Sequence, residues 1–131
     1  MTLKELYQLR NLNREIEYHK KRIELLRANA LSPSKPNLSD SSFDGYDSSR
    51  VERYAAEIID TEAIIHSLTL QCIHERNRLE RYIANISDSL TRQIFSLRFV
   101  DGFNWTQIAN KVGNNTGDSV KKICYRYLRK K

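Results

Sequence analysis

Apolar side chains recur in alternating steps of three and four residues along the first 30 positions, with charged residues between them. Such spacing places one apolar stripe along an α-helix, where it faces a single partner helix. Thr2 and Glu5 have the spacing of a capping box, which satisfies the first free amides of a helix. The pattern predicts one amphipathic helix from Thr2 to about Ala30, with this stripe: Leu9, Leu12, Ile16, His19, Ile23, Leu26 and Ala30.

A second series of apolar residues, from Val51 to Ile86, advances in the same steps of three and four. Ser49 and Glu52 repeat the capping-box spacing and predict where this second helix begins. Residues 31–48 contain both prolines of the chain and many serines without apolar periodicity, which predicts a flexible linker. Residues 1–86 are therefore expected to form a long, antiparallel, coiled-coil-like helical hairpin.

After Ile86 the pattern changes to three short helices. The first ends at Gly102, the second at Gly113, and the third covers about residues 118–129. Glycine is common just past a helix terminus because it accepts the left-handed backbone conformation. The expected fold is all-α: the hairpin of residues 1–86 followed by a small trihelical domain over residues 87–131.

The last two short helices have the pattern of a helix-turn-helix. Asn104 and Gln107 predict the start of the first of them, Ala109 is small where the helices cross, and Gly113 permits the reversal. Trp105 is expected to pack in the trihelical core. Apolar residues three or four apart anchor the last helix on its inner side: Val120, Ile123, Cys124, Tyr127 and Leu128.

The outer side of the last helix carries side chains that can reach phosphates and base edges in a major groove. These candidate DNA-binding residues are Ser119, Lys121, Lys122, Tyr125, Arg126 and Arg129, preceded by the turn residues Asn114, Asn115 and Thr116. The turn residues either serve only the turn and the helix cap or also touch DNA.

The net charge of the 131-residue chain is +6, and its location supports this interpretation. Residues 104–131 contain seven Lys and Arg residues against a single acidic residue, Asp118, whereas residues 1–103 are balanced. A concentrated basic segment attracts polyanions, although a solvated basic tail has the same composition.

Catalytic and membrane functions have little support in the sequence. The chain has no glycine-rich phosphate loop and no nucleophile motif, and its histidines and cysteines lack metal-ligand spacing. We therefore expect a non-enzymatic protein without a cofactor. The uncharged stretch Ala63–His74 has only 12 residues, too few to span a bilayer, and the opening residues lack the apolar core of a signal peptide, so a cytoplasmic protein is expected.

Residues 90–131 resemble region 4 of bacterial sigma factors. The resemblance lies in Leu97-Arg98-Phe99, the glycine turn after it, Ile108-Ala109, a second glycine and a basic last helix. With the polar helical hairpin and the opening segment Leu9–Ile16, the chain resembles phage-encoded ArpU/RinA-type late-transcription activators. One departure is the turn from Gly113 to Val120, which is about one residue longer than in a compact helix-turn-helix and leaves the entry angle of the last helix open.

The resemblance implies a DNA-binding transcription regulator of phage or prophage origin, acting at the nucleoid of a bacterial host. Its expected partner is double-stranded DNA. The hairpin then either pairs with a second copy, giving a homodimer, or contacts RNA polymerase. Two alternatives are a phage packaging protein such as a small terminase subunit, and a helical oligomerisation protein whose basic end binds any polyanion.

Overall fold

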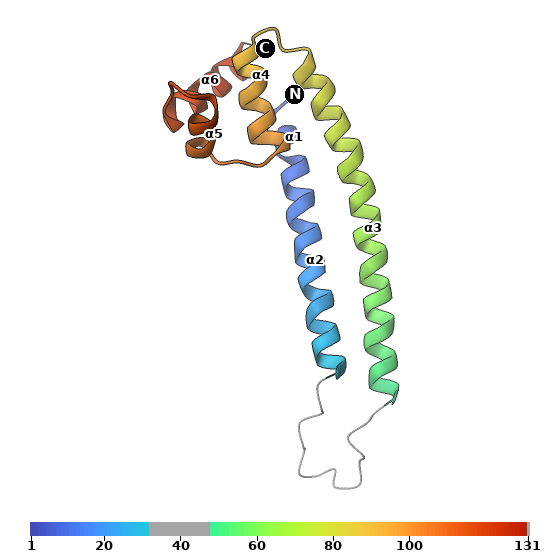
Figure 1. Cartoon of the computed structure of the whole chain (residues 1–131). Helices are drawn as coiled ribbons and strands as arrows, with labels where there is room; N and C mark the ends of the chain where they lie inside the picture. The colour runs from blue at the N-terminus through green and yellow to red at the C-terminus, as the bar shows by residue number, and fades with distance from the viewer. Residues whose placement is uncertain (32–47, 131) are drawn as a thin grey trace. The chain divides into compact units, whose positions relative to one another are not determined.

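The computed structural model describes residues 1–31 and 48–130, and within these ranges it contains helices and no strand (Figure 1). The expected all-α class is therefore confirmed. The expected linker over residues 31–48 lies outside the described residues, except for its ends: Leu31 closes α2 and Ser48 opens α3.

The N-terminal helix predicted from Thr2 to Ala30 is interrupted at Tyr7, so its prediction as one unbroken helix is wrong. The first segment, α1 (Leu3–Leu6), begins with the expected capping box: the Glu5 amide donates to the Thr2 hydroxyl at 3.2 Å, and the Thr2 amide to the Glu5 carboxylate at 2.9 Å. Tyr7 ends α1 with a ψ of 0°, and α2 (Gln8–Leu31) follows. The Tyr7 ring packs edge-on against Phe99 at 5.2 Å, a contact between distant parts of the chain that helical periodicity does not report.

The second long helix, α3, covers Ser48–Ala84. It ends two residues before the expected Ile86, in a tight turn in which the Ile86 amide donates to the Ile83 carbonyl at 3.0 Å. Together with α2 it contributes to two compact units. Unit 1 comprises Met1–Arg14 and Leu70–Lys131, and unit 2 comprises Glu15–Thr69.

In unit 2, segments of α2 and α3 bury the predicted stripe residues between them. Ile16, Ile23, Leu26 and Leu68 are all buried. Near the ends of the two segments the Arg50 guanidinium donates to the Asn29 carbonyl at 2.8 Å. The end of α2 therefore lies beside the beginning of α3.

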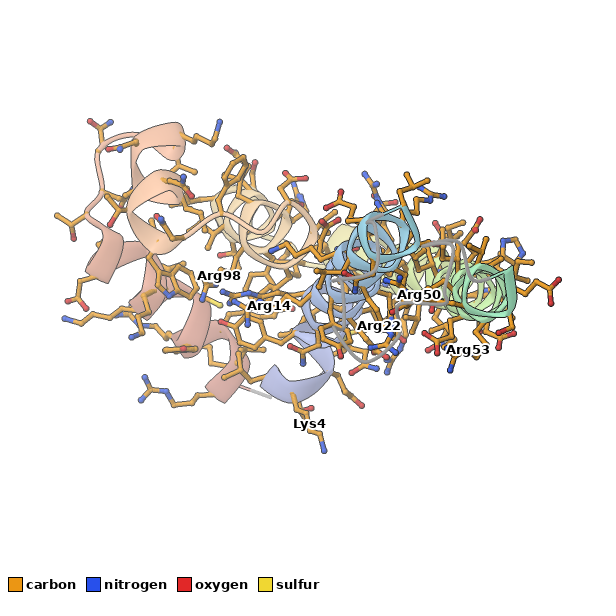
Figure 2. All side chains as sticks on the ribbon, turned by 90° about the horizontal axis from the view of Figure 1, so that it is seen from below. Lys4, Arg14, Arg22, Arg50, Arg53 and Arg98 are labelled. Atoms are coloured by element: carbon orange, nitrogen blue, oxygen red, sulfur yellow. The ribbon has the colours of Figure 1, made fainter. Side chains whose placement is uncertain are left out.

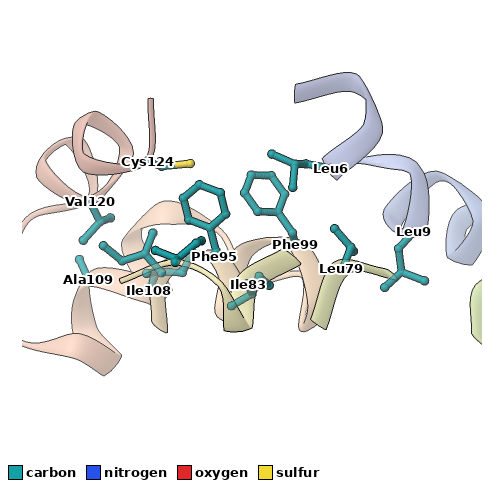
Figure 3. Close-up of a cluster of buried hydrophobic side chains, with 12 residues drawn as sticks. Leu6, Leu9, Leu79, Ile83, Phe95, Phe99, Ile108, Ala109, Val120 and Cys124 are labelled. Atoms are coloured by element: carbon teal, nitrogen blue, oxygen red, sulfur yellow. The ribbon is translucent and has the colours of Figure 1, made fainter. Parts of the chain in front are cut away.

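Unit 1 is built around two phenylalanines, Phe95 and Phe99, which are almost completely buried. In Figure 3 the two rings lie between Leu6 of α1 and Cys124 of α6 (Gly117–Arg129). The cluster also contains side chains from α2 and α3, namely Leu9, Leu79 and Ile83. Packing thus crosses the boundary expected between residues 86 and 87, and the short helices share one core with both ends of the long ones.

The first short helix, α4 (Ser89–Phe95), is capped by Asp88, whose carboxylate accepts from the Thr91 amide at 3.0 Å. It continues into a π-helical turn, η1 (Ser96–Val100), which the sequence pattern did not predict. A π turn holds one more residue than an α turn, and such turns are common at functional sites. Gly102, with a φ of 79°, follows the cap residue Asp101 of this turn, where the sequence predicts the end of the first short helix.

Candidate nucleic-acid interface

Helix α5 (Trp105–Val112) presents the predicted inner face to the core of unit 1. Its capping box is formed as predicted: the Gln107 amide donates to the Asn104 side chain at 2.8 Å, and the Asn104 amide to the Gln107 side chain at 3.0 Å. Ile108 and Ala109 are buried. The helix ends at Gly113, whose φ of 75° and ψ of 162° lie in a region that only glycine adopts readily.

Helix α6 follows after a short turn and begins one residue earlier than expected, at Gly117. A Cβ atom placed on Gly117 would lie 3.3 Å from the Thr106 amide nitrogen and 3.4 Å from the Trp105 carbonyl carbon. The start of α6 therefore lies directly on the first turn of α5. Ala109, where the sequence predicts the helix crossing, is buried, and Gly117 is a further point at which the two helix backbones approach closely.

The inner side of α6 is the predicted one. Val120 and Cys124 are fully buried, and the other predicted anchors are half-buried: Ile123, Tyr127 and Leu128. Burial raises the pKa of the Cys124 thiol to about 12, so this cysteine is neutral and unreactive at physiological pH.

The outer side of α6 carries exposed cations that the structure brings together. Four of them line one shallow surface pocket: Lys122, Arg126, Arg129 and Lys130. We call these four residues the basic face. Lys130 was missed by the sequence analysis, although it lies four residues after Arg126 and therefore on the same side of a helix. Lys121 is also exposed, on a neighbouring strip beside Tyr125.

Most polar groups of the turn are engaged within the turn itself. The Asn115 side-chain amide donates to the Gly113 backbone carbonyl at 2.9 Å, and the Ser119 hydroxyl donates to the Asn115 side-chain oxygen Oδ1 at 3.1 Å. The Thr116 hydroxyl accepts from the Ser119 amide at 3.1 Å and so caps α6. Asn114 is exposed, with a φ of 54° that asparagine tolerates better than most residues.

Tyr125 and Trp105 meet edge-on at 6.2 Å, at the junction of α5 and α6. Trp105 is half-buried and packs against the core, as expected. Burial raises the pKa of the Tyr125 phenol further above neutrality. The hydroxyl can donate a hydrogen bond to an anion. The Lys121 ammonium lies 5.8 Å from the centre of the Tyr125 ring.

Neither a metal cluster nor a membrane-spanning helix is found among the described residues. Among residues 1–31 and 48–130 no group of three or more His, Cys, Asp or Glu side chains is arranged to hold a metal ion. In the same part of the chain, every helix is too short or too polar to cross a membrane.

Comparison with protein-family models, with curated proteins and with solved structures gives no match. The resemblance to sigma factor region 4 and to ArpU/RinA-type activators stays a prediction from the sequence.

Proposed function

We propose that this protein is a sequence-specific, DNA-binding transcription regulator in which α5 and α6 act as a helix-turn-helix. The observation that carries the proposal is the basic face: four exposed cations on one side of a helix whose opposite side is buried in a folded core. A helix fixed in this way holds its cations in a row, which a disordered basic tail does not do.

The cations of the basic face are spread along a helix of a kind that a DNA groove admits. Lys122 and Arg129 lie seven residues apart on α6, or about 10 Å along the helix axis. The major groove of B-DNA is about 12 Å wide and admits an α-helix. Cations spaced along such a helix reach phosphates on the groove edges, and binding then releases counterions from the DNA.

The turn contributes less to this proposal than its polarity suggests. The Ser119 hydroxyl hydrogen and one of the two amide hydrogens of Asn115 are already donated within the turn, so these side chains offer fewer donors to DNA than their polarity suggests. We therefore propose that the cations of α6 supply most of the affinity, with Tyr125 as a neutral hydrogen-bond donor beside them.

The proposal of a transcriptional role, of phage or prophage origin, rests on the resemblance to sigma factor region 4 and to ArpU/RinA-type activators. In such a regulator the long helices serve either to pair two copies or to contact RNA polymerase. A chain that is monomeric by light scattering at all concentrations would favour contact with the polymerase.

Selection of bound duplexes from a random pool tests the proposal. We expect one sequence to be enriched and to bind more tightly than random DNA. If about four to six phosphates are contacted, the logarithm of its binding constant should fall with the logarithm of salt concentration with a slope of about −4 to −5. Equal affinity for selected and random duplexes would contradict sequence-specific recognition, and a slope near zero would contradict the role of the basic face.

A further inference from the structure

The Arg98 side chain of η1 lies among groups from distant parts of unit 1. Its Nε and Nη2 atoms both donate to the Tyr7 hydroxyl, at 3.2 and 3.0 Å, and its Nη1 donates to the Phe103 carbonyl at 3.1 Å. The guanidinium carbon lies 4.4 Å from the centre of the Trp105 ring. In Figure 2 Arg98 lies within the folded unit, whereas the exposed Lys4 projects away from it.

A series of contacts continues from Arg98 to the outer side of α6. Trp105, which stacks with Arg98, meets Tyr125 edge-on, and the Lys121 ammonium lies near the Tyr125 ring. Tyr7 and Arg98 also act on the Tyr125 phenol directly: beside the larger effect of burial, Tyr7 raises its pKa and Arg98 lowers it. The series leads from the end of α1 to the candidate DNA interface: Tyr7, Arg98, Trp105, Tyr125 and Lys121.

Arg98 depends on neutral partners to hold its charge. It is half-buried, and none of the ion pairs among the described residues involves it. A guanidinium withdrawn from water needs hydrogen-bond acceptors for its N–H groups. The Tyr7 hydroxyl is the acceptor for two of its nitrogens. Without that hydroxyl the guanidinium would gain more by turning toward solvent, and it would then leave the Trp105 ring.

We propose that Arg98 is a positioning residue for the DNA-facing side of α6, and that the Tyr7 hydroxyl keeps it in place. The N-terminal segment then contributes to DNA affinity without touching DNA. This inference rests on the proposed function, because affinity for duplex DNA is one of its two readouts.

The first test replaces Tyr7 by Phe in the full chain, which removes only the hydroxyl. Tyr18→Phe is the matched control, because Tyr18 belongs to unit 2 and its side chain is 62% exposed. Trp105 is the sole tryptophan of the chain, so tryptophan fluorescence reports on the surroundings of this one ring. We expect acrylamide to quench Trp105 more strongly in Tyr7→Phe, and duplex affinity to fall about threefold to tenfold, which corresponds to the loss of one ordinary hydrogen bond.

The second variant, Arg98→Lys, keeps the positive charge but loses the planar fork that binds Tyr7 and stacks on Trp105. We expect it to weaken DNA binding as much as Tyr7→Phe does. If Arg98→Lys instead binds DNA as tightly as the parent, Arg98 acts only through its charge, for example by attracting phosphate. That result would overturn the proposal. Thermal unfolding is measured for each variant, and affinities are compared at a temperature where all variants are folded.

The outcomes separate this inference from the proposed function. If the parent binds its selected duplex and Tyr7→Phe matches Tyr18→Phe in affinity or in Trp105 quenching, the inference is wrong and the proposed function stands. If affinity falls only at temperatures where Tyr7→Phe begins to unfold, Tyr7 is merely structural and the inference is also wrong. If the parent binds no duplex, the proposed function is wrong, and so is the claim that Arg98 contributes to DNA affinity.

Discussion

The Lys122 ammonium lies 3.1 Å from a carboxylate oxygen of Asp118, one helical turn earlier on α6. Both side chains are about 70% exposed, so the pair contributes little to stability. The position of this ion pair is important for DNA binding, because Asp118 is the sole acidic residue among residues 104–131. A phosphate that approaches Lys122 must compete with this carboxylate.

Replacing Asp118 by Asn should therefore strengthen binding to duplex DNA. We expect an increase of about twofold to fivefold at low salt, which shrinks as salt screens the charges. Asp60→Asn, at an exposed position in unit 2, is the control for the change in net charge. Equal effects of the two variants in a salt titration would show that net charge alone matters and that the ion pair does not compete with DNA.

Replacing Arg126 by Ala should weaken DNA binding, because Arg126 belongs to the basic face and is exposed. A cost of about 1–3 kcal/mol with relaxed sequence preference is expected if Arg126 contacts a base, and a uniform loss with a shallower salt slope if it contacts a phosphate. Arg22→Ala on α2 serves as the control, since it removes an exposed cation from unit 2. If the Arg126 variant binds DNA as tightly as the parent, the proposal that α6 contacts DNA is wrong.

Features of the fold that depend on residues close in the sequence could be predicted, and features that depend on distant residues could not. The capping boxes at Thr2 and Asn104 and the stop at Gly113 depend on residues a few positions apart, so they could be predicted from the sequence. The break at Tyr7 could not, because the tyrosine bonds to Arg98, which is 91 residues away. The π turn η1 was missed because apolar periodicity does not register one extra residue in a turn.

Some features of the candidate interface could likewise be predicted from the sequence, and others could not. Amphipathic spacing predicts which side of α6 faces water, and Lys122, Arg126 and Arg129 are exposed as that spacing requires. The same spacing does not show whether a polar side chain is free. Ser119 was a candidate from its place on the outer side of the helix, and for Asn115 the sequence left open whether it serves the turn or DNA; only the folded turn shows the two side chains bonded to each other.

The shared core of unit 1 predicts that α1 stabilises the short helices. Leu6 is fully buried in the cluster with Phe95 and Phe99, so Leu6→Ala should lower the free energy of unfolding by about 2–5 kcal/mol. Leu25→Ala is the matched control, because Leu25 is 63% exposed. Urea denaturation of both variants measures the difference. If the two variants unfold alike, α1 does not belong to the cooperative core.

The close approach at Gly117 predicts a steric effect that the neighbouring glycine does not share. An alanine Cβ there would press on the backbone of Trp105 and Thr106, whereas one at Gly113 would meet no atom within 4 Å. Gly117→Ala should displace α6 from α5, lowering stability by about 1 kcal/mol or more and changing the fluorescence of Trp105. Gly113→Ala should cost about 1–3 kcal/mol through its positive φ alone and leave that fluorescence unchanged. Identical spectra for the parent and Gly117→Ala would contradict this account of the crossing.

The buried thiol of Cys124 predicts how stability depends on alkaline pH. Its pKa is about 12 in the folded protein, above the ordinary value of 9.0 that the unfolded chain should show. The unfolded chain therefore loses this proton first, so the contribution is fully present below pH 9 and is lost as the pH rises toward 12. The raised pKa values of the Tyr82 and Tyr125 phenols act in the same direction. Urea unfolding between pH 8 and 11 should show this decline, with a smaller slope in Cys124→Ala; an equal slope would mean that the thiol ionises as readily in the fold as outside it.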